Sequence, residues 1–314
     1  MAISAFNTNL SKVPQYLQGH LAMLTYAALV AGSFSLGSIV ANEIAPTAIS
    51  AVRFALATTV MGVVTFWAPG FKRSDFFAPW RYFILGGLQS IYFVFMFIGL
   101  KTASPVSSAA VFTLIPLFSG AFAFILLRQI MSMRMIMALI LAAIGAIWVI
   151  LRGDLQALKA FKLGQGELIY LYGCIIVGIY TPMIPKLNRG ESAITFTFGT
   201  LFAGSLLLVI FAFNDIRMTD WFNLPTIVWL TLGYLVIFST AISFVLLQFA
   251  AMRLPSAKVM AYTYLTPVWV ILWEVLIGNG LPQAFVIPGV LLTICALIIL
   301  VKNEKVRAKI NGTE

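Results

Sequence analysis

Charged residues are scarce in this sequence. Only 10% of its 314 residues are Asp, Glu, Lys or Arg, whereas 61% are hydrophobic and the mean hydropathy is +1.00. A soluble domain usually has about 25% charged residues. The composition therefore argues against an ordinary soluble enzyme or binding domain and indicates an integral membrane protein.

Histidine and cysteine are nearly absent as well. His20 is the single histidine, which argues against haem, multi-histidine metal sites and histidine-based catalytic triads. Cys174 and Cys295 lie in apolar runs, where packing is the expected role. The sequence also lacks a GxxxxGK[ST] loop, so energy must come from a gradient or from the substrate. No metal or cofactor is expected.

Long apolar runs fill most of the chain. A transmembrane helix needs about 20 mostly apolar residues. By that measure we predict ten spans, at 20–41, 46–67, 79–100, 105–127, 133–151, 167–185, 193–213, 226–250, 256–278 and 283–302. The predicted fold is an all-α integral membrane protein of ten transmembrane helices, with no soluble domain.

The basic residues are divided unequally between the two sides that these spans define. Thirteen Lys and Arg residues fall in the tails and loops of one side and five on the other. The excess of Lys and Arg marks the cytoplasmic side. We therefore predict that both termini are cytoplasmic, as an even number of spans requires, and that the protein is integral to the plasma (bacterial inner) membrane.

The two halves of the sequence resemble each other. Residues 104–116 read SPVSSAAVFTLIP and residues 255–267 read PSAKVMAYTYLTP; both begin with small residues and reach a proline twelve positions later. Upstream, EIAPTAIS at 43–50 resembles RGESAIT at 189–195. The order of these matches predicts an internal repeat.

The predicted repeats are 20–151 and 167–302, joined by 152–166 and flanked by tails at 1–19 and 303–314. Each repeat has five spans, an odd number, so the second must enter the membrane from the opposite side. Inverted repeats are typical of alternating-access transporters, whose substrate site lies at the repeat interface.

Four segments carry a resemblance to a known family. They are GLKTASPVSSAAVFTLIP at 99–116, YTP at 180–182, STAISF at 239–244 and YLTP at 264–267. In this order and spacing the sequence resembles the drug/metabolite transporter (DMT) superfamily, in its ten-span EamA-type branch. The resemblance implies an inverted five-plus-five fold, a central cavity and transport of small metabolites, often as export.

Two prolines lie in the middle of spans at matching repeat positions. Pro116 and Pro267 each remove a backbone donor, which leaves a carbonyl four residues earlier without its helical partner. Such positions can line a cavity or form a hinge, and Pro182 is a third hinge candidate. The alternative is a plain kink, since proline is common in membrane helices.

Charged residues within the spans are the main candidates for chemistry. Glu274 is the single acidic residue well inside an apolar span, so it is a candidate for proton coupling or for binding a substrate ammonium. A structural ion pair near the outer surface is the alternative.

Arg53 and Lys258 are the basic candidates. Arg53 could pair with Glu274, hold a substrate carboxylate or snorkel at the outer interface. Lys258, at the inner start of the ninth span, could snorkel into the cytoplasm or face the cavity as a fixed positive charge.

Tyrosines recur in the spans, and Tyr92, Tyr180, Tyr262 and Tyr264 are candidate substrate contacts. A tyrosine hydroxyl binds polar groups while the ring packs against apolar ones. Helix packing or the interfacial belt is the alternative for most of them.

These observations predict a secondary active transporter that is not an enzyme. The expected substrate is an amino acid or a related zwitterion or amine, and the expected direction is export. The partners would be the small-molecule substrate, the lipid bilayer and protons, with no nucleic acid, in a monomer or weak dimer. The alternative is a polytopic membrane protein with channel or membrane-enzyme activity.

Overall fold

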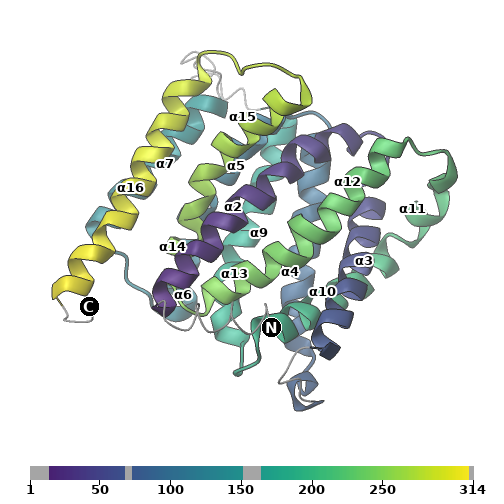
Figure 1. Cartoon of the computed structure of the whole chain (residues 1–314), viewed down its shortest axis with the longest axis horizontal. Helices are drawn as coiled ribbons and strands as arrows, with labels where there is room; N and C mark the ends of the chain where they lie inside the picture. Colours follow the sequence, from purple (N-terminus) through teal and green to yellow (C-terminus); the bar gives the residue numbers. More distant parts are fainter. Residues whose placement is uncertain (1–13, 68–72, 151–163, 311–314) are drawn as a thin grey trace, which may run out of the picture.

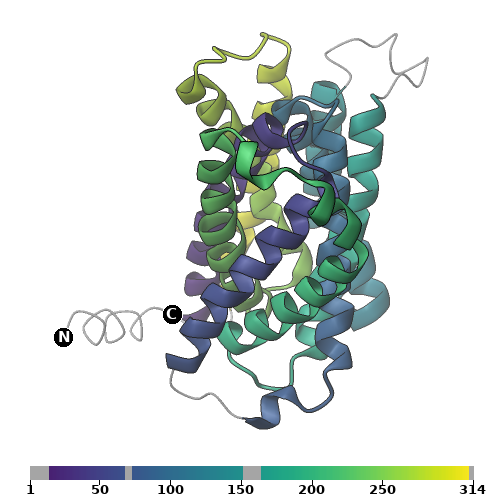
Figure 2. The ribbon, with the colours of Figure 1, turned by 90° about the vertical axis from the view of Figure 1, so that its right-hand side faces the viewer.

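The computed structural model describes residues 14–67, 73–150 and 164–310, and in these residues every regular element is helical. Figures 1 and 2 show a bundle whose long helices extend between two ends, where the connections lie. The long and broken helices are α2 (Gln15–Val40), α3 (Pro46–Trp67), α4 (Trp80–Leu100), α5 (Pro105–Phe112), α6 (Ile115–Leu127), α7 (Met133–Ile150), α9 (Gln165–Leu187), α10 (Ala193–Phe211), α12 (Thr226–Val236), α13 (Ser243–Ala251), α14 (Ser256–Ala261), α15 (Thr266–Ile277) and α16 (Val286–Ile310).

Among the described residues, nine segments are long and apolar enough to cross a membrane. They coincide within a few residues with the first nine predicted spans, which confirms the helical membrane class. The tenth span, predicted at 283–302, corresponds to α16, whose apolar stretch Val286–Ile299 is shorter. The count of ten therefore stays a prediction. The start of α2 and the end of α16 lie at the same end of the bundle (Figure 1).

Two of the crossing segments are broken near their middle. Helices α5 and α6 are separated by a turn at Thr113 and Leu114, and a 3₁₀ turn at Tyr262–Leu265 separates α14 from α15. Pro116 and Pro267 then stand in the first turn of the new helix, where a missing N–H costs nothing. The prolines therefore start helices after a break instead of kinking continuous ones, and the break recurs at matching positions.

Pro182 differs from these two prolines. It lies inside α9, which continues without interruption from Gln165 to Leu187. All three prolines are buried. Their role as hinges stays a prediction.

The packing of the crossing segments follows a repeat. Helix α4 packs along α9, and its counterpart α12–α13 packs along α2; likewise α6 contacts α9 while α15 contacts α2. Three further pairs join equivalent segments directly: α3 with α10, α6 with α14 and α7 with α16. These contacts are the ones that a two-fold axis between two repeats produces.

Glycines allow the tightest of these contacts. A Cβ on Gly86 of α4 would meet the backbone nitrogen of Gly204 at 2.5 Å and the carbonyl oxygen of Thr200 at 2.6 Å. At the α7–α16 contact, a Cβ on Gly145 would meet the carbonyl oxygen of Gly289 at 2.6 Å. Helices in lipid associate through close backbone packing of this kind, because apolar side chains gain little by leaving lipid for each other.

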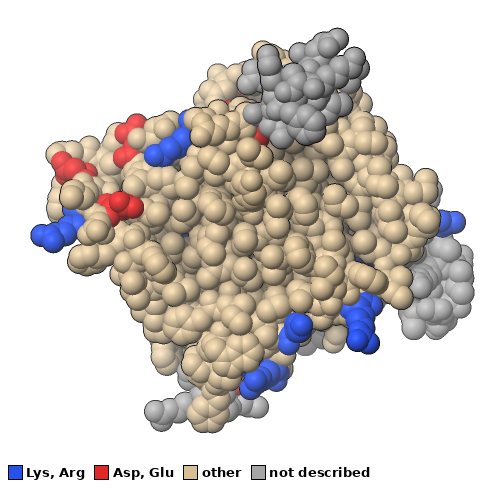
Figure 3. Space-filling view, turned by 180° about the vertical axis from the view of Figure 1, so that it is seen from behind, with Lys and Arg blue, Asp and Glu red and all other residues tan. Residues whose placement is uncertain are grey.

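The two ends of the bundle differ in charge. Figure 3 shows a broad belt without charged atoms between basic side chains at one end and acidic side chains, with basic ones among them, at the other. At the acidic end a pocket of about 420 Å³ is lined by Glu43, Asp215 and Asp220, and Asp215 accepts a hydrogen bond from Thr47.

A buried ion pair joins the halves at the basic end. An Nη2–H of Arg81, at the start of α4, donates to the Glu191 carboxylate at 2.6 Å, and an Nη1–H donates to the Leu187 carbonyl at 2.7 Å. The Arg189 N–H also donates to Glu191 at 2.6 Å. Burial alone raises the pKa of Glu191, but the bonds from Arg81 and from the backbone outweigh it and leave that pKa below its ordinary value of 4.5.

The Gly86 contact predicts an asymmetry between neighbouring glycines. Gly86→Ala forces a methyl group into backbone atoms and should destabilise the protein by about 1–3 kcal/mol, seen as a lower melting temperature in detergent. Gly87→Ala is the matched control, because its Cβ would meet only the tip of Leu207, at 3.5 Å. Equal melting temperatures for the two variants would contradict the tight crossing.

The ion pair predicts a specific acid sensitivity. Because the pKa of Glu191 is lowered on folding, the pair stabilises the protein at neutral pH and the contribution is lost as pH falls below 4.5 through the folded value. Glu191→Gln should lower the melting temperature at pH 7. The melting temperature of the variant should also fall less steeply below pH 4.5 than that of the wild type. Breaking a buried pair typically costs about 3–5 kcal/mol. A variant that keeps the wild-type melting temperature at pH 7 would refute this role.

Candidate functional site

Arg53 lies at the centre of a buried polar group between the two halves. Its side chain, on α3, is 0% exposed. The Nε–H donates to the hydroxyl of Thr240, and the Nη2 group donates to the carbonyl oxygen of Ser239 at 2.9 Å and to its hydroxyl at 3.1 Å. The sequence-based alternative of a snorkelling side chain at the outer interface is therefore wrong.

The partners of Arg53 come from a π-helical turn, Ile237–Ile242, between α12 and α13. Thr240 donates its hydroxyl proton to the Leu235 carbonyl at 2.7 Å, and Ser243 donates to the Ser239 carbonyl at 2.8 Å. Ser33 of α2 is hydrogen-bonded to the Ser239 hydroxyl. π-Turns are frequent at functional sites, and this one supplies a carbonyl to a cation at membrane depth.

Aromatic side chains complete the surroundings of the guanidinium. Its central carbon lies 3.9 Å from the ring centroid of Phe93, a cation–π contact. Phe93 stacks on Phe244 with their centroids 5.9 Å apart. Tyr26 and Tyr92 also lie near the guanidinium of Arg53. The charge is thus held by dipoles and ring faces.

Arg53 has no acidic partner among the residues that the structure describes. The buried charged side chains in that part of the chain are Arg53, Arg81, Glu167 and Glu191. Glu191 pairs with Arg81, and Glu167 accepts a hydrogen bond from Ser107 at 2.7 Å. The Nη1 group of Arg53 is buried without a hydrogen-bond partner. A buried cation without a counter-ion is costly, so its presence needs an explanation.

A second group of polar side chains surrounds Tyr180 of α9. The Gln248 amide donates to the Tyr180 hydroxyl at 3.1 Å and to Thr200 at 3.3 Å, and its carbonyl oxygen accepts from Thr197 at 2.9 Å. Gln89 of α4 also interacts with the Tyr180 hydroxyl. These residues come from α4, α9, α10 and α13, so both halves contribute.

The two groups form one site, because the segment Thr226–Ala251 supplies Ser239 and Thr240 to Arg53 and Gln248 to Tyr180, and Tyr26 lies near both. We call it the central polar cluster; its members are Tyr26, Arg53, Gln89, Tyr92, Tyr180, Ser239, Thr240 and Gln248. Each member is at most 6% exposed, so the cluster is closed in this conformation. It offers a cation, two amides and several hydroxyls to a small polar molecule.

Glu274 lies away from this cluster. It is partly exposed near the end of α15, and one carboxylate oxygen accepts a hydrogen bond from the Asn279 amide at 2.9 Å. Its other oxygen is buried without a hydrogen-bond partner. The pairing of Arg53 with Glu274, one of the sequence-based alternatives, is not formed. Coupling through Glu274 stays a prediction.

The other sequence-based candidates are dispersed. Tyr92 belongs to the cluster and is hydrogen-bonded to Tyr170, with 2.9 Å between the hydroxyl oxygens. Tyr262 is bonded instead to His20 near the start of α2, at 2.8 Å. Tyr264 packs against the apolar cluster that α7 and α16 form. Lys258 is partly exposed on α14.

Sequence reasoning missed the two glutamines of the cluster. Gln89 and Gln248 are 3% and 0% exposed; Gln89 lies in the middle of an apolar span and Gln248 near the end of one. A neutral amide within an apolar span needs hydrogen-bond partners. It therefore indicates a buried polar contact, just as a charged side chain within a span does. Attention to amides would have found both.

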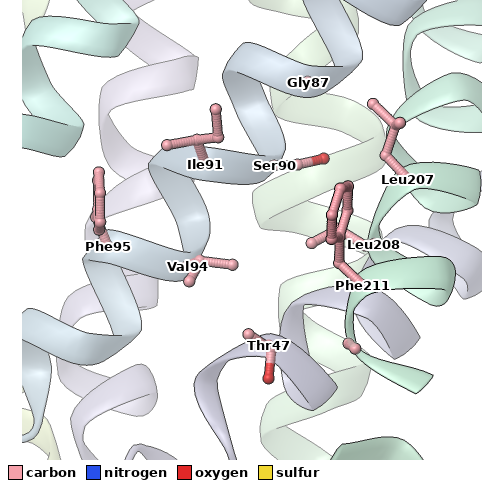
Figure 4. Close-up of a pocket in the computed structure, with 10 residues that line it drawn as sticks. Thr47, Gly87, Ser90, Ile91, Val94, Phe95, Leu207, Leu208 and Phe211 are labelled. Atoms are coloured by element: carbon pink, nitrogen blue, oxygen red, sulfur yellow. The ribbon is translucent and has the colours of Figure 1, made fainter. Parts of the chain in front are cut away.

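An apolar groove is a separate feature. It has a volume of about 380 Å³ and lies between α4 and α10, where Ile91, Val94, Leu207 and Phe211 are among the residues that line it (Figure 4). Phe211 is 81% exposed and Ile91 45%. The groove thus opens on the outer surface of the bundle, where lipid tails can fill it, and contains no member of the central polar cluster.

Comparison with known proteins agrees with this architecture. The model of the EamA-like transporter family matches residues 17–151 and again 164–302. An uncharacterized transporter of Bacillus subtilis (strain 168), YyaM, is 22% identical over 286 residues, covering 90% of this chain and 93% of that protein. An uncharacterized transporter of Archaeoglobus fulgidus is 22% identical over 289 residues, covering 91% and 98%.

A solved crystal structure shows the same fold. It superposes with a TM-score of 0.68 at 19% identity, over 91% of this chain and 95% of that chain. The family match covers both halves separately, which agrees with the repeat in the packing. The chain therefore belongs to the EamA-like transporter family and is an integral membrane transporter with two repeats.

Proposed function

We propose that this protein is a secondary active transporter that exports a small metabolite, an amino acid or a related zwitterion or amine, by alternating access through the central polar cluster. The observation that carries the proposal is the position of that cluster. Its polar groups are buried at the interface of the two halves, where inverted-repeat transporters bind their substrates.

The closed state of the cluster fits this mechanism. At the basic end the halves are held together by the Arg81–Glu191 pair, which links α4 to the connection between α9 and α10. Access from that end requires the halves, 20–151 and 167–302, to separate there. The breaks beside Pro116 and Pro267 are the positions at which we expect α5–α6 and α14–α15 to bend.

We further propose that the basic end is cytoplasmic and that the membrane is the bacterial inner membrane. The support is the unequal distribution of Lys and Arg, together with the acidic pocket at the opposite end. Cysteines placed at positions 10 and 310, with Cys174 and Cys295 replaced by serine, should resist an impermeant thiol reagent in intact cells. Labelling of either introduced cysteine would contradict the proposed orientation.

Transport is tested with purified protein in liposomes. We expect the protein to accelerate exchange of at least one labelled amino acid or amine from a panel, in a saturable manner, above the rate of protein-free liposomes. A Gln248→Leu variant should exchange at least about tenfold more slowly, because Tyr180 and Thr197 lose their amide partner. Exchange by no panel member would count against the proposed substrate class.

Glu274 is tested for coupling in the same liposomes. If it carries the coupling proton, Glu274→Gln abolishes flux driven by an imposed pH gradient but keeps exchange of labelled for unlabelled substrate, because glutamine retains the shape without the proton. Asn279→Ala is the control, since it removes the hydrogen bond to Glu274 and keeps the carboxylate. Wild-type gradient-driven flux in Glu274→Gln would remove Glu274 from the mechanism.

A further inference from the structure

We propose that Arg53 binds the carboxylate of the transported molecule, so that the substrate must carry a carboxylate and simple amines are excluded. The inference rests on the proposed function and narrows its substrate class. It starts from the one buried cation in the described part of the chain that has no carboxylate partner.

The first argument is the hydrogen-bond geometry of Arg53. The guanidinium is held by Thr240 and Ser239 through Nε and Nη2, while Nη1 has no hydrogen-bond partner. A carboxylate oxygen that accepts from Nη1 would form a charge-assisted hydrogen bond, which is stronger than one between neutral groups. Three of its five N–H donors thus bond to the protein, and the two on Nη1 are left for a ligand.

The second argument is the charge of the surroundings. Phe93, Tyr26 and Tyr92 around Arg53 are neutral, and Gln89 and Gln248 beyond them are neutral as well. One carboxylate would cancel the single positive charge. A phosphate monoester, which carries close to two negative charges, would leave one of them buried without a partner.

The third argument is the contrast with Arg81. Both arginines are buried, at 0% and 1% exposure, but Arg81 has the carboxylate of Glu191 at 2.6 Å. The protein therefore supplies a counter-ion for Arg81, the structural arginine at the basic end. Among the residues that the structure describes, it supplies no counter-ion for Arg53. A transporter gains from this arrangement, because the ligand that enters provides the missing charge.

The experiment uses matched compounds on one carbon skeleton. For alanine, leucine and phenylalanine, each amino acid is compared with the acid that lacks its amino group and the amine that lacks its carboxylate; inorganic phosphate is added as a separate probe. Binding is measured as the ligand-dependent rise in melting temperature of the purified full-length protein, and exchange in liposomes is measured alongside.

We expect carboxylate-bearing probes to bind and the matched amines to fail. Arg53→Gln should weaken carboxylate binding by about ten- to a hundredfold, the range for losing one charged hydrogen bond in a buried site. Arg53→Lys should keep the preference for acids over amines with lower affinity. Arg81→Gln is the control; it should lower the melting temperature without altering that preference.

Several outcomes would overturn the assignment. Amines that bind as well as their acids, or an unchanged preference in folded Arg53→Gln, would make Arg53 a structural residue. Binding of phosphate in preference to every carboxylate would assign the site to phosphate. Exchange of amines alone would reject the carboxylate site and keep the transport function, whereas wild-type protein with neither binding nor exchange would reject both.

Discussion

The structure depends on one constraint: a backbone group inside hydrocarbon must find its hydrogen-bond partner within the protein. Helices satisfy it along most of each span. Where the α-helical pattern fails, side chains take over. Thr113 donates to the Ala110 carbonyl at the break after α5, and Thr240 and Ser243 do the same for Leu235 and Ser239 at the π-turn. The irregular backbone is therefore buried in protein, and at the π-turn it lies beside Arg53.

The same constraint separates the roles of the helices. Helices α7 and α16 meet at the Gly145–Gly289 crossing and form, with Tyr264, an apolar cluster apart from the centre. Helices α2, α3, α4, α9 and α13, together with the π-turn, carry the central polar cluster. The α7–α16 pair thus supplies close packing, and the helices of the central polar cluster hold polar side chains in the interior of the bundle. Tyr264, which lies in the apolar cluster, shows that residue type alone does not assign a role.

Much of the fold could be predicted from the sequence, because lipid forces a simple pattern of long apolar runs. The class and the first nine segments followed from it, and the family from four short segments that resemble it. The site was harder to predict. Arg53 and Tyr92 were found because charge and hydroxyls stand out in apolar runs, but Glu274 and Tyr262 stand out equally and lie elsewhere. The direction in which a side chain faces depends on helix rotation, and an unpredicted π-turn changes that rotation.

The π-turn also sets how α12 and α13 are rotated relative to each other about the helix axis. An α-helix turns by about 100° for each residue, so widening one turn offsets the faces of α12 from those of α13. On one side of the turn Tyr234 covers Gly32 and donates to the Leu29 carbonyl at 2.9 Å; on the other, Gln248 reaches Tyr180. Deleting one residue between 237 and 242 would restore a regular helix of nearly the same length and hydropathy. It would swing one of these two side chains towards lipid, so the span would still insert while the halves lost their alignment.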